Sequence, residues 1–370
     1  MLNRVLVAAA VSTLALLACS SDVQGPAGGG SHAAGGSSST STGGASGGTS
    51  SGGTSGATSG GTSGATSGSS GTGSSSGNPV NTETWGDGKQ ITANVDIVAG
   101  ATVTIAPGAH ITVTPGVAIT VHGTLTASSK ATHAKLTSTA AWGGIIVASG
   151  GSMTLTGVDI TNAGITANGN DLAAQYDYGT ITAGLFTVDV AGKLTTDHAA
   201  VVTGGATNVN GAFTATFLDY SGSEISMGDP SATVSVIDSK ITGSGGDFFT
   251  PGSGKLLHIS YSTIDKTHCP IHMSGIAKFE LDHVTTGGTS ATSTSGFGLM
   301  VYNADVGPHT VSYSNFNDPN WDQTVRTAVI NIDHSYFKVA PATVGQVTTT
   351  AKQTAMVLDA KPRATPGPLG

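Results

Sequence analysis

Apolar residues alternate with polar ones in short pairs along the chain from residue 95 onward. Each of four successive pairs begins eight residues after the one before it: Val95/Ile97, Val103/Ile105, Ile111/Val113 and Ile119/Val121. Alternation within a pair is the strand period, which places both side chains on one face. Turn-forming residues, such as those of Ala106-Pro107-Gly108, stand between the pairs. Short strands and tight turns at this step, three to a circuit, predict a solenoid with coils of about 24 residues.

A looser repeat continues in the C-terminal half. Four copies place Ser before a strand: Asp238-Ser239-Lys240-Ile241, Tyr261-Ser262-Thr263-Ile264, Tyr313-Ser314-Asn315-Phe316 and His334-Ser335-Tyr336-Phe337. Asp282-His283-Val284 falls in the double step between the second and third copies, as a degenerate fifth. Each copy follows an apolar residue that we expect to point inward, from Val236 to Ile332. The repeat predicts at least five successive coils, with roughly eight residues inserted between Thr285 and Ser295.

Several of these segments resemble a known superfamily. Ile105-Ala106-Pro107-Gly108, the run Val121 to Ala127, and Trp142-Gly143-Gly144-Ile145 look like the opening coils of right-handed parallel β-helix proteins of the pectin-lyase-like superfamily. The run Leu358 to Arg363 is similar to the segment that follows the last coil in several such proteins. The resemblance, from about Val80 to Arg363, implies an all-β, right-handed parallel β-helix. It leaves activity open, because this fold hosts lyases, hydrolases, epimerases, adhesins and inert spacers.

The first residues have the layout of an export signal. Arg4 precedes an apolar run from Val5 to Ala18, which is too short for a stable membrane span. The run ends in Leu16-Leu17-Ala18-Cys19, which resembles the lipobox of bacterial lipoproteins, where cleavage precedes a cysteine that is then diacylated. The resemblance implies a signal peptide over residues 1–18, lipidation of Cys19 and membrane attachment. Ser20 in place of Asp favours the outer membrane or cell surface, by similarity to enteric lipoproteins.

Composition divides the rest of the chain into a segment of small residues and a part that can form an apolar core. Residues 27–77 contain only Gly, Ser, Thr and Ala apart from His32, and all aromatic residues lie at or after Trp85. Such a segment buries too little apolar surface to offset its ordering entropy, which predicts a disordered linker. We therefore expect a lipidated N-terminus and flexible linker over 19–78, a β-helix over 79–340 and a C-terminal cap or tail over 341–370. Residues 78–90, with Trp85, are expected to cap the first coil.

Charge limits the classes of ligand that the protein can bind, and cysteine content limits its disulfides. The formal net charge is −8 and Arg326 is the only arginine between Arg4 and Arg363, which argues against nucleic-acid binding. Few cations are present to hold a polyuronate, so a neutral glycan, or an anionic one bridged by calcium, fits better. Cys269 is the only cysteine besides Cys19, so the mature domain has no intramolecular disulfide.

The repeat alignment places two outward columns side by side, the first with Ile237, Ser260, Asp282, Ser312 and Asp333, the second with Ser235, His258, Glu280, Thr310 and Asn331. Neighbouring coils lie about 5 Å apart, so Asp282, Glu280 and His258 would meet. Paired carboxylates can share a proton, bind calcium or act as acid and base. The alternative is a solvated acidic face.

The stretch that ends in Asp333-His334 resembles a stretch of pectate lyases, but it lacks the tryptophan usually found two residues before that Asp. A lyase of that type would also need an arginine as the base that abstracts a proton, and Arg326 is the only arginine in the predicted coils.

Two further groups could contact ligands. His268-Cys269-Pro270-Ile271-His272 offers ligands for zinc or copper, but an extended strand would hold the two histidines more than about 10 Å apart. We therefore expect Cys269 to pack as a small apolar group and expect no metal cofactor. Trp321, on a predicted loop over residues 317–322, is the candidate for stacking on a sugar ring, with a role as a loop anchor as the alternative.

Three functions remain open at this point. The favoured one is a membrane-anchored surface lipoprotein whose β-helix binds or organises extracellular or cell-wall polysaccharide without catalysis. The second is a polysaccharide lyase, glycoside hydrolase or epimerase that uses Asp282, Glu280, His258 or Asp333 with Arg326. The third is a structural spacer or adhesin without a ligand.

Overall fold

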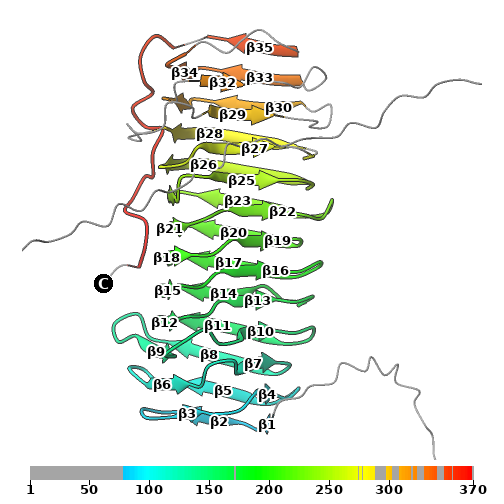
Figure 1. Cartoon of the computed structure of the whole chain (residues 1–370), viewed down its shortest axis with the longest axis vertical. Helices are drawn as coiled ribbons and strands as arrows, with labels where there is room; N and C mark the ends of the chain where they lie inside the picture. Colours follow the sequence, from blue (N-terminus) through cyan, green and yellow to red (C-terminus); the bar gives the residue numbers. More distant parts are fainter. Residues whose placement is uncertain are drawn as a thin grey trace, which may run out of the picture. The chain divides into compact units, whose positions relative to one another are not determined.

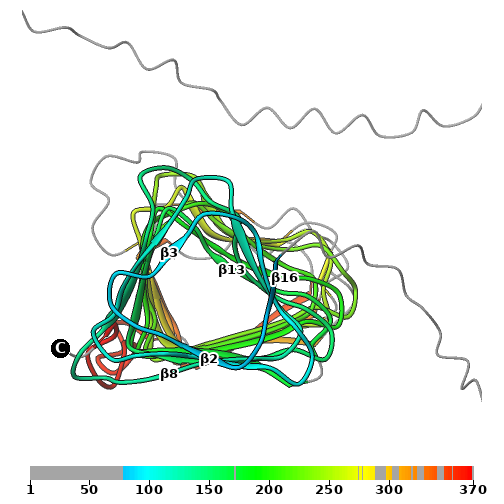
Figure 2. The same cartoon turned by 90° about the horizontal axis from the view of Figure 1, so that it is seen from below.

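The computed structural model describes residues 78–170, 172–273, 275–276, 278–287, 297–301, 308–317, 320–322, 329–339, 346–351 and 353–368. These residues form an all-β parallel solenoid (Figure 1). Seen along its axis, each coil has a triangular outline with three faces (Figure 2). The predicted linker and Cys19 lie outside the described residues.

The first face is one 12-stranded parallel sheet. Its strands are β1 (Asn78–Val80), β4 (Val95–Ile97), β7 (Ala118–Val121), β10 (Gly144–Val147), β13 (Ile165–Ala167), β16 (Phe186–Val188), β19 (Thr207–Val209), β22 (Ile225–Met227), β25 (Asp247–Pro251), β27 (Cys269–Met273), β29 (Phe297–Val301) and β32 (Asn320–Asp322). Every pairing in this sheet is parallel, because each coil returns in the same direction as the one before.

The second face carries the outward columns predicted from the repeat. Its strands are β2 (Glu83–Trp85), β5 (Thr102–Ile105), β8 (Thr124–Ser128), β11 (Ser152–Thr156), β14 (Ala174–Asp177), β17 (Lys193–Asp197), β20 (Ala212–Thr216), β23 (Thr233–Ile237), the first parts of β26 (Leu256–Asp265) and β28 (Phe279–Thr286), β30 (His309–Ser312), β33 (Val329–Asp333) and β35 (Gln346–Thr350).

The third face completes each circuit. Its strands are β3 (Gln90–Ile91), β6 (His110–Val113), β9 (Ala134–Thr137), β12 (Val158–Thr161), β15 (Thr180–Thr182), β18 (Ala200–Gly204), β21 (Asp219–Gly222), β24 (Lys240–Gly243), the later parts of β26 and β28, β31 (Asn315–Phe316) and β34 (Tyr336–Phe337). β26 and β28 each run continuously around the corner between the second and third faces.

The eight-residue alternation is confirmed in the core. Val103, Ile111 and Ile119 are fully buried, and Val95 pairs with Ile119, 24 positions later. Later coils are shorter where connections shrink; Thr207, for example, pairs with Ile225. Inward side chains fill the narrow interior from end to end, and this apolar burial is the main force that holds the coils together.

Both predicted end segments differ from expectation in detail. Residues 78–91 form the three strands of a first coil, and Trp85 is fully buried as part of the core. A tryptophan is large enough to fill the end of the interior from within the coil. At the other end, β35 lies beyond the predicted boundary at residue 340 and pairs with β33, so the solenoid continues into the predicted cap.

A left-handed backbone turn separates the second and third faces, and we call its residues the aromatic corner: Tyr178, His198, Phe217, Asp238, Tyr261, His283, Tyr313 and His334, with φ between 45° and 55°. Their rings stack coil upon coil, as between Tyr178 and His198 at 4.9 Å, and between His283 and Tyr313 at 5.0 Å. Stacking of this kind offsets the strain of a non-glycine residue in this region.

The serine of the C-terminal repeat follows the aromatic corner and faces the interior. The Ser314 hydroxyl donates to the Ser312 carbonyl at 2.7 Å and accepts the Val284 N–H at 3.1 Å. Ser239 does the same with the Ile237 carbonyl and the Leu218 N–H. One small buried hydroxyl therefore satisfies backbone groups of two coils at a corner where the strand ladder is interrupted.

Residues 357–367, which we call the C-terminal strap, run back along the outside of the solenoid from its last coils (Figure 1, red). The view along the axis places them against one corner of the triangle (Figure 2). The strap is joined to the coils at Asn315, Thr285, Asp238 and the Phe217 carbonyl. The predicted C-terminal tail is thus held along the side of the coils.

Arg363 anchors the strap at the one acidic position of the aromatic corner. Its Nε lies 2.8 Å from Asp238 Oδ1 and its Nη2 lies 2.5 Å from Oδ2, while the guanidinium lies 4.1 Å from the Tyr261 ring centre. Asp238 is 1% exposed. The guanidinium therefore occupies the place in the stack that an aromatic ring would otherwise fill.

Candidate functional site

The two outward columns lie on the second face in the predicted register. His258 is paired with Glu280, and Ser260 with Asp282. The columns continue through Thr310 and Ser312 to Asn331 and Asp333 in the next two coils. The structure therefore brings His258, Glu280 and Asp282 together on consecutive strands, and places Asp333 two coils away.

Glu280 lies between the side chains of Lys278 and His258. Lys278 Nζ lies 2.6 Å from its Oε1, and His258 Nδ1 lies 3.2 Å from its Oε2. The hydrogen bond from Lys278 lowers the pKa of Glu280 below its ordinary value; partial burial opposes this effect, and His258 adds to it. A carboxylate with a lowered pKa is a poor proton donor at neutral pH, which disfavours Glu280 as a general acid.

Asp282 and Asp333 each face a histidine of the aromatic corner. Asp282 Oδ1 accepts a hydrogen bond from Ser312 Oγ at 2.7 Å and lies 3.0 Å from His283 Nδ1. Asp333 Oδ1 lies 2.8 Å from His334 Nδ1. The same Asp-His arrangement occurs at Asp197, 2.9 Å from the next residue's Nδ1. Of these three contacts, only the one between Asp197 and His198 is a hydrogen bond; among the described residues, Nδ1 of His283 and of His334 makes none. The recurrence of the Asp-His contact along the corner indicates a structural role.

Asp177 is an acidic residue that the sequence analysis missed. It is 7% exposed and precedes Asp197 in the first outward column. Burial raises its pKa, against the opposing hydrogen bonds from Gln175 Nε2 and the Asp197 N–H. Both of its oxygens accept hydrogen bonds from these two donors, at 2.5 and 2.9 Å. A buried carboxyl with both oxygens engaged is poorly placed to transfer a proton to a substrate.

Two predicted functional residues lie in the later coils. Trp321 belongs to β32 and not to the predicted loop, because residues 320–322 pair with β29. The prediction of an irregular segment was wrong here because Asn and Asp around the tryptophan resemble turn chemistry. Arg326 lies outside the described residues, as does most of the segment from Thr285 to Ser295 in which the insertion was predicted, since residues 288–295 are not described.

A row of hydroxyl groups runs along the N-terminal half of the second face. The residues are in register from strand to strand and partly or fully exposed: Thr84, Thr104, Thr126, Thr154, Thr195, Thr214 and Ser235, with Gln175 in the same column. We call this row the hydroxyl ladder. The sequence signal was Thr at every second position, as in Thr102-Val103-Thr104, which is also what an exposed strand favours.

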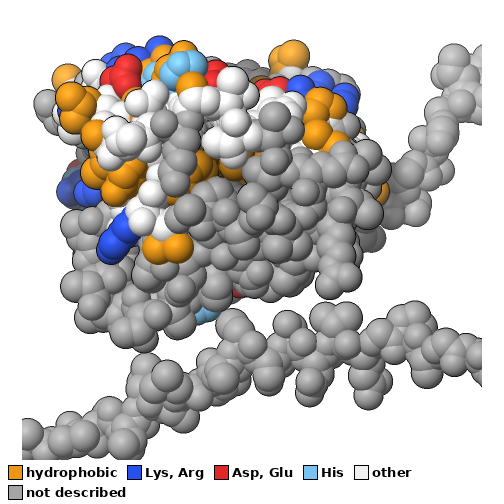
Figure 3. Space-filling view, turned by 90° about the horizontal axis from the view of Figure 1, so that it is seen from above, with side chains coloured by type: hydrophobic (Ala, Val, Ile, Leu, Met, Phe, Trp, Pro, Cys, Tyr) orange, Lys and Arg blue, Asp and Glu red, His pale blue; other side chains and the backbone are white. Residues whose placement is uncertain are grey.

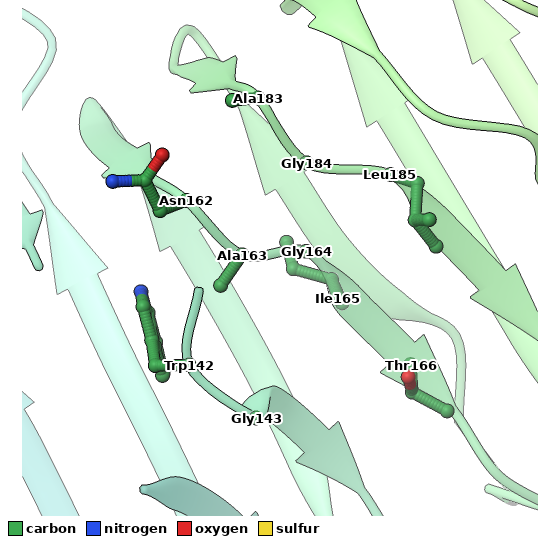
Figure 4. A pocket seen from close by; sticks show the side chains of 10 residues that line it. All are labelled: Trp142, Gly143, Asn162, Ala163, Gly164, Ile165, Thr166, Ala183, Gly184 and Leu185. Carbon is green, nitrogen blue, oxygen red and sulfur yellow. The ribbon is translucent and has the colours of Figure 1, made fainter. Parts of the chain in front are cut away.

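A shallow groove lies at the junction of the third and first faces (Figure 4). Its volume is about 280 Å³, and its lining includes Trp142, Asn162 and Thr166. Trp142 is 6% exposed, and its Nε1 donates to the Thr161 carbonyl at 2.9 Å. A Cβ on Gly164 or Gly184 would lie within 2 Å of the neighbouring coil's carbonyl oxygen, so glycine is required for the coils to approach here. The groove is therefore a product of tight corner packing.

The predicted metal-binding string gathers around one carboxylate from the previous coil. Asp247 of β25 is paired with Cys269 of β27. His268 Nδ1 lies 3.1 Å from Cys269 Sγ and 3.6 Å from Asp247 Oδ1, and His272 Nδ1 lies 2.6 Å from Asp247 Oδ2. The expectation that the strand would separate the two histidines overlooked this shared acidic partner. Cys269 is 1% exposed, as predicted for a buried thiol.

Among the residues coloured in Figure 3, Lys or Arg, acidic and His side chains lie interspersed near one edge of the view. Within the described part of the chain, no helix has the length and hydrophobicity needed to cross a membrane.

The register, core and corners together define the protein as a parallel β-solenoid. Comparison with family models, with curated proteins and with solved structures found no match for this chain.

Proposed function

We propose that the protein is an exported bacterial lipoprotein, anchored through Cys19 at the outer membrane or cell surface, whose solenoid binds polysaccharide without catalysis. The resemblance of residues 16–19 to a lipobox supports the anchor. The resemblance of the opening coils to right-handed β-helix proteins of the pectin-lyase-like superfamily supports a carbohydrate ligand. Residues 19–78 would then act as a flexible linker between membrane and solenoid.

The observation that carries the proposal is the hydroxyl ladder. Parallel strands lie about 4.8 Å apart, so the ladder repeats donors and acceptors at a spacing similar to the length of one sugar unit in an extended glycan. Thr126 and Thr104 are 3.4 Å apart between their Oγ1 atoms, at the limit of hydrogen bonding, so each hydroxyl can still bond to a ligand. A repeated polar surface suits a repeated neutral polymer.

The partners of the acidic residues favour binding over catalysis. Glu280, Asp282 and Asp333 each lie within 3.0 Å of a Lys or His nitrogen. A glycosidase needs one carboxyl group held protonated beside another that stays ionised. The lowered pKa of Glu280 is the opposite of what a general acid requires.

The test uses the full chain carrying Cys19→Ala, which removes the proposed lipid attachment. Binding to an array of neutral and uronate-containing polysaccharides is measured together with the release of reducing ends and of unsaturated products. We expect binding to at least one neutral glycan and no release of products. An array without binding would contradict the proposal, and product release would favour the enzymatic alternative.

Matched variants locate the site. Thr126→Arg with Thr154→Arg blocks the hydroxyl ladder on adjacent strands, whereas Thr112→Arg with Thr137→Arg adds the same charge on adjacent strands of the third face. We expect the first pair to weaken glycan binding at least about tenfold, roughly 1.4 kcal/mol, and the second pair to leave it unchanged. Equal effects of the two pairs would place the site elsewhere, and Trp321→Ala then tests the later coils.

The anchor has a separate test. The wild-type chain should partition with membranes in the bacterial host and incorporate labelled palmitate, whereas the Cys19→Ala variant should be released without label. Membrane retention of the variant would exclude Cys19 as the attachment point, without bearing on glycan binding.

A further inference from the structure

We propose that Asp247, His268 and Cys269 form a binding site for a divalent transition metal of the zinc class, with His272 orienting the carboxylate. The site joins two coils at the start of β27. It goes beyond the proposed glycan binding and does not depend on it.

The three donor atoms already lie at the spacing of a coordination shell. One ligand atom from each of Asp247, His268 and Cys269 lies within 4.8 Å of the other two. Tetrahedral zinc with bonds of about 2.0–2.3 Å holds its ligands roughly 3.3–3.8 Å apart. The observed separations of 3.1 Å between Sγ and Nδ1, and of 3.6 Å between Nδ1 and Oδ1, require only small side-chain movements.

The carboxylate is prepared for this role. Asp247 Oδ1 is buried and makes no hydrogen bond of standard geometry with the described residues; His268 Nδ1 lies 3.6 Å from it and the Cys269 thiol lies beside the same carboxylate, whereas Oδ2 is bound to His272 Nδ1. A cation held between the carboxylate, the imidazole and the thiol would complete the interactions of this oxygen. The second oxygen bonded to an imidazole is the arrangement by which outer groups fix a metal ligand.

A catalytic cysteine explains the cluster less well. In a Cys-His-Asp hydrolase the two nitrogens of the imidazole contact the nucleophile and the acid separately, so that a proton can move between them. Here the same nitrogen, Nδ1 of His268, lies 3.1 Å from Cys269 Sγ and 3.6 Å from Asp247 Oδ1. A single nitrogen directed between sulfur and oxygen fits a shared metal ion better than a proton relay.

The donor set selects the metal class. A thiolate and an imidazole favour zinc, cobalt or copper over calcium and magnesium, which prefer oxygen ligands. Three protein ligands leave a fourth position for water. The side chains of His268 and Asp247 are 27% and 22% exposed, which gives a metal ion access from solvent.

The experiment uses the full chain with Cys19→Ala, in which Cys269 is the only thiol. Chelator-treated protein is titrated with Co²⁺ alone, followed by displacement with Zn²⁺. We expect one equivalent of Co²⁺ to produce a sulfur-to-cobalt charge-transfer band and the intense visible bands of a tetrahedral site, and Zn²⁺ to abolish both and slow alkylation of Cys269. Co²⁺ binding without the charge-transfer band, or the absence of stoichiometric binding, would overturn the proposal.

Single substitutions test the role of each residue at the proposed metal site. Cys269→Ser and His268→Ala should remove the charge-transfer band or the tight binding, and Asp247→Asn should weaken binding at least about tenfold. His272→Gln should retain the band with an affinity lowered about 10- to 100-fold, as expected of an orienting group. His258→Ala, a histidine with an acidic partner elsewhere, is the control and should bind as the parent does. Unfolding of the metal-free variants checks that each remains folded; unchanged affinity in folded Cys269→Ser and Asp247→Asn would also overturn the proposal.

Discussion

The early and the later coils turn the same corner in different ways. Between the second and third faces, the first two coils use four residues, as in Ala106 to Ala109, with a positive φ at Gly108. The later coils use two, and the left-handed position is taken by a residue such as His198, with φ 50°. A non-glycine residue there costs about 1–2 kcal/mol. The comparison teaches that stacking between coils can stabilise a turn that the local sequence disfavours.

The largest effect is expected where the two corner types meet. Gly157 occupies the left-handed position in the coil that precedes the coil of Tyr178. A Cβ on Gly157 would lie 1.7 Å from the Ser129 carbonyl oxygen. Gly157→Ala should lower the free energy of unfolding by more than about 3 kcal/mol, because the clash adds to the strain. Denaturant unfolding measures this change.

Gly88→Ala is the matched control for that substitution. Gly88 lies at the same corner of the first coil, between β2 and β3, and has a similar φ of 77°, but no atom lies within 4 Å of the added Cβ. Its cost should be about 1 kcal/mol, from backbone strain alone. Equal losses at the two positions would show that contact between coils does not distinguish the corners.

The next largest loss of stability is expected when the C-terminal strap loses its anchor. Arg363→Ala leaves the buried Asp238 carboxylate without its cation, and a buried unpaired charge is strongly unfavourable. We expect a lower unfolding temperature and faster proteolytic cleavage within residues 357–367. Arg363→Lys should recover only part of the loss, because an ammonium group cannot make the paired contact or stack on Tyr261.

Acid should release the same anchor. Burial acts to raise the pKa of Asp238, but the hydrogen bonds and charge of Arg363 lower it below its ordinary value. A lowered folded-state pKa gives a stabilisation that is complete above the unfolded pKa of about 3.9 and is lost as the pH falls through the folded value. The stability difference between wild type and Arg363→Ala should therefore be largest near neutral pH and shrink as the pH falls, until the carboxyl is protonated in both folded proteins. A difference that persists in strong acid would contradict this pairing.

The smallest effect tests the stack itself. His198 lies 4.9 Å from the Tyr178 ring and 4.4 Å from the Phe217 ring. His198→Ala keeps the strained backbone and removes both ring contacts, which should cost about 1–2 kcal/mol. His198→Phe should stay within about 0.5 kcal/mol of wild type, since an aromatic ring remains in place. A similar loss in both variants would assign the stability to the Asp197 contact instead.

Periodic features of the structure were predictable from the sequence, and non-periodic ones were not. Alternation at a constant step predicted buried positions such as Val103 and Ile119, and the repeat predicted the pairing of His258 with Glu280. Both follow because in-register strands repeat each side-chain position once per coil. The left-handed corner was missed, since Tyr261 and His283 do not resemble turn residues.

Contacts that depend on three-dimensional register were missed for a different reason. Asp247 meets Cys269 only because one coil returns beneath the next, and the local spacing of His268 and His272 carries no trace of it. Arg363 contacts Asp238 across 125 positions, outside any repeat. Trp321 was assigned to a loop because its polar neighbours also occur in turns.

The strap gives the solenoid a fixed length. Stacked coils have no intrinsic stopping point, and a gain or loss of one coil leaves every neighbouring pair intact. The strap, however, spans a set distance between Asn315 and Asp238. One additional coil between these anchors would separate them by about 5 Å more, so that both could not be held at once. The strap thus limits the number of coils between its two anchors, although those coils precede it in the chain.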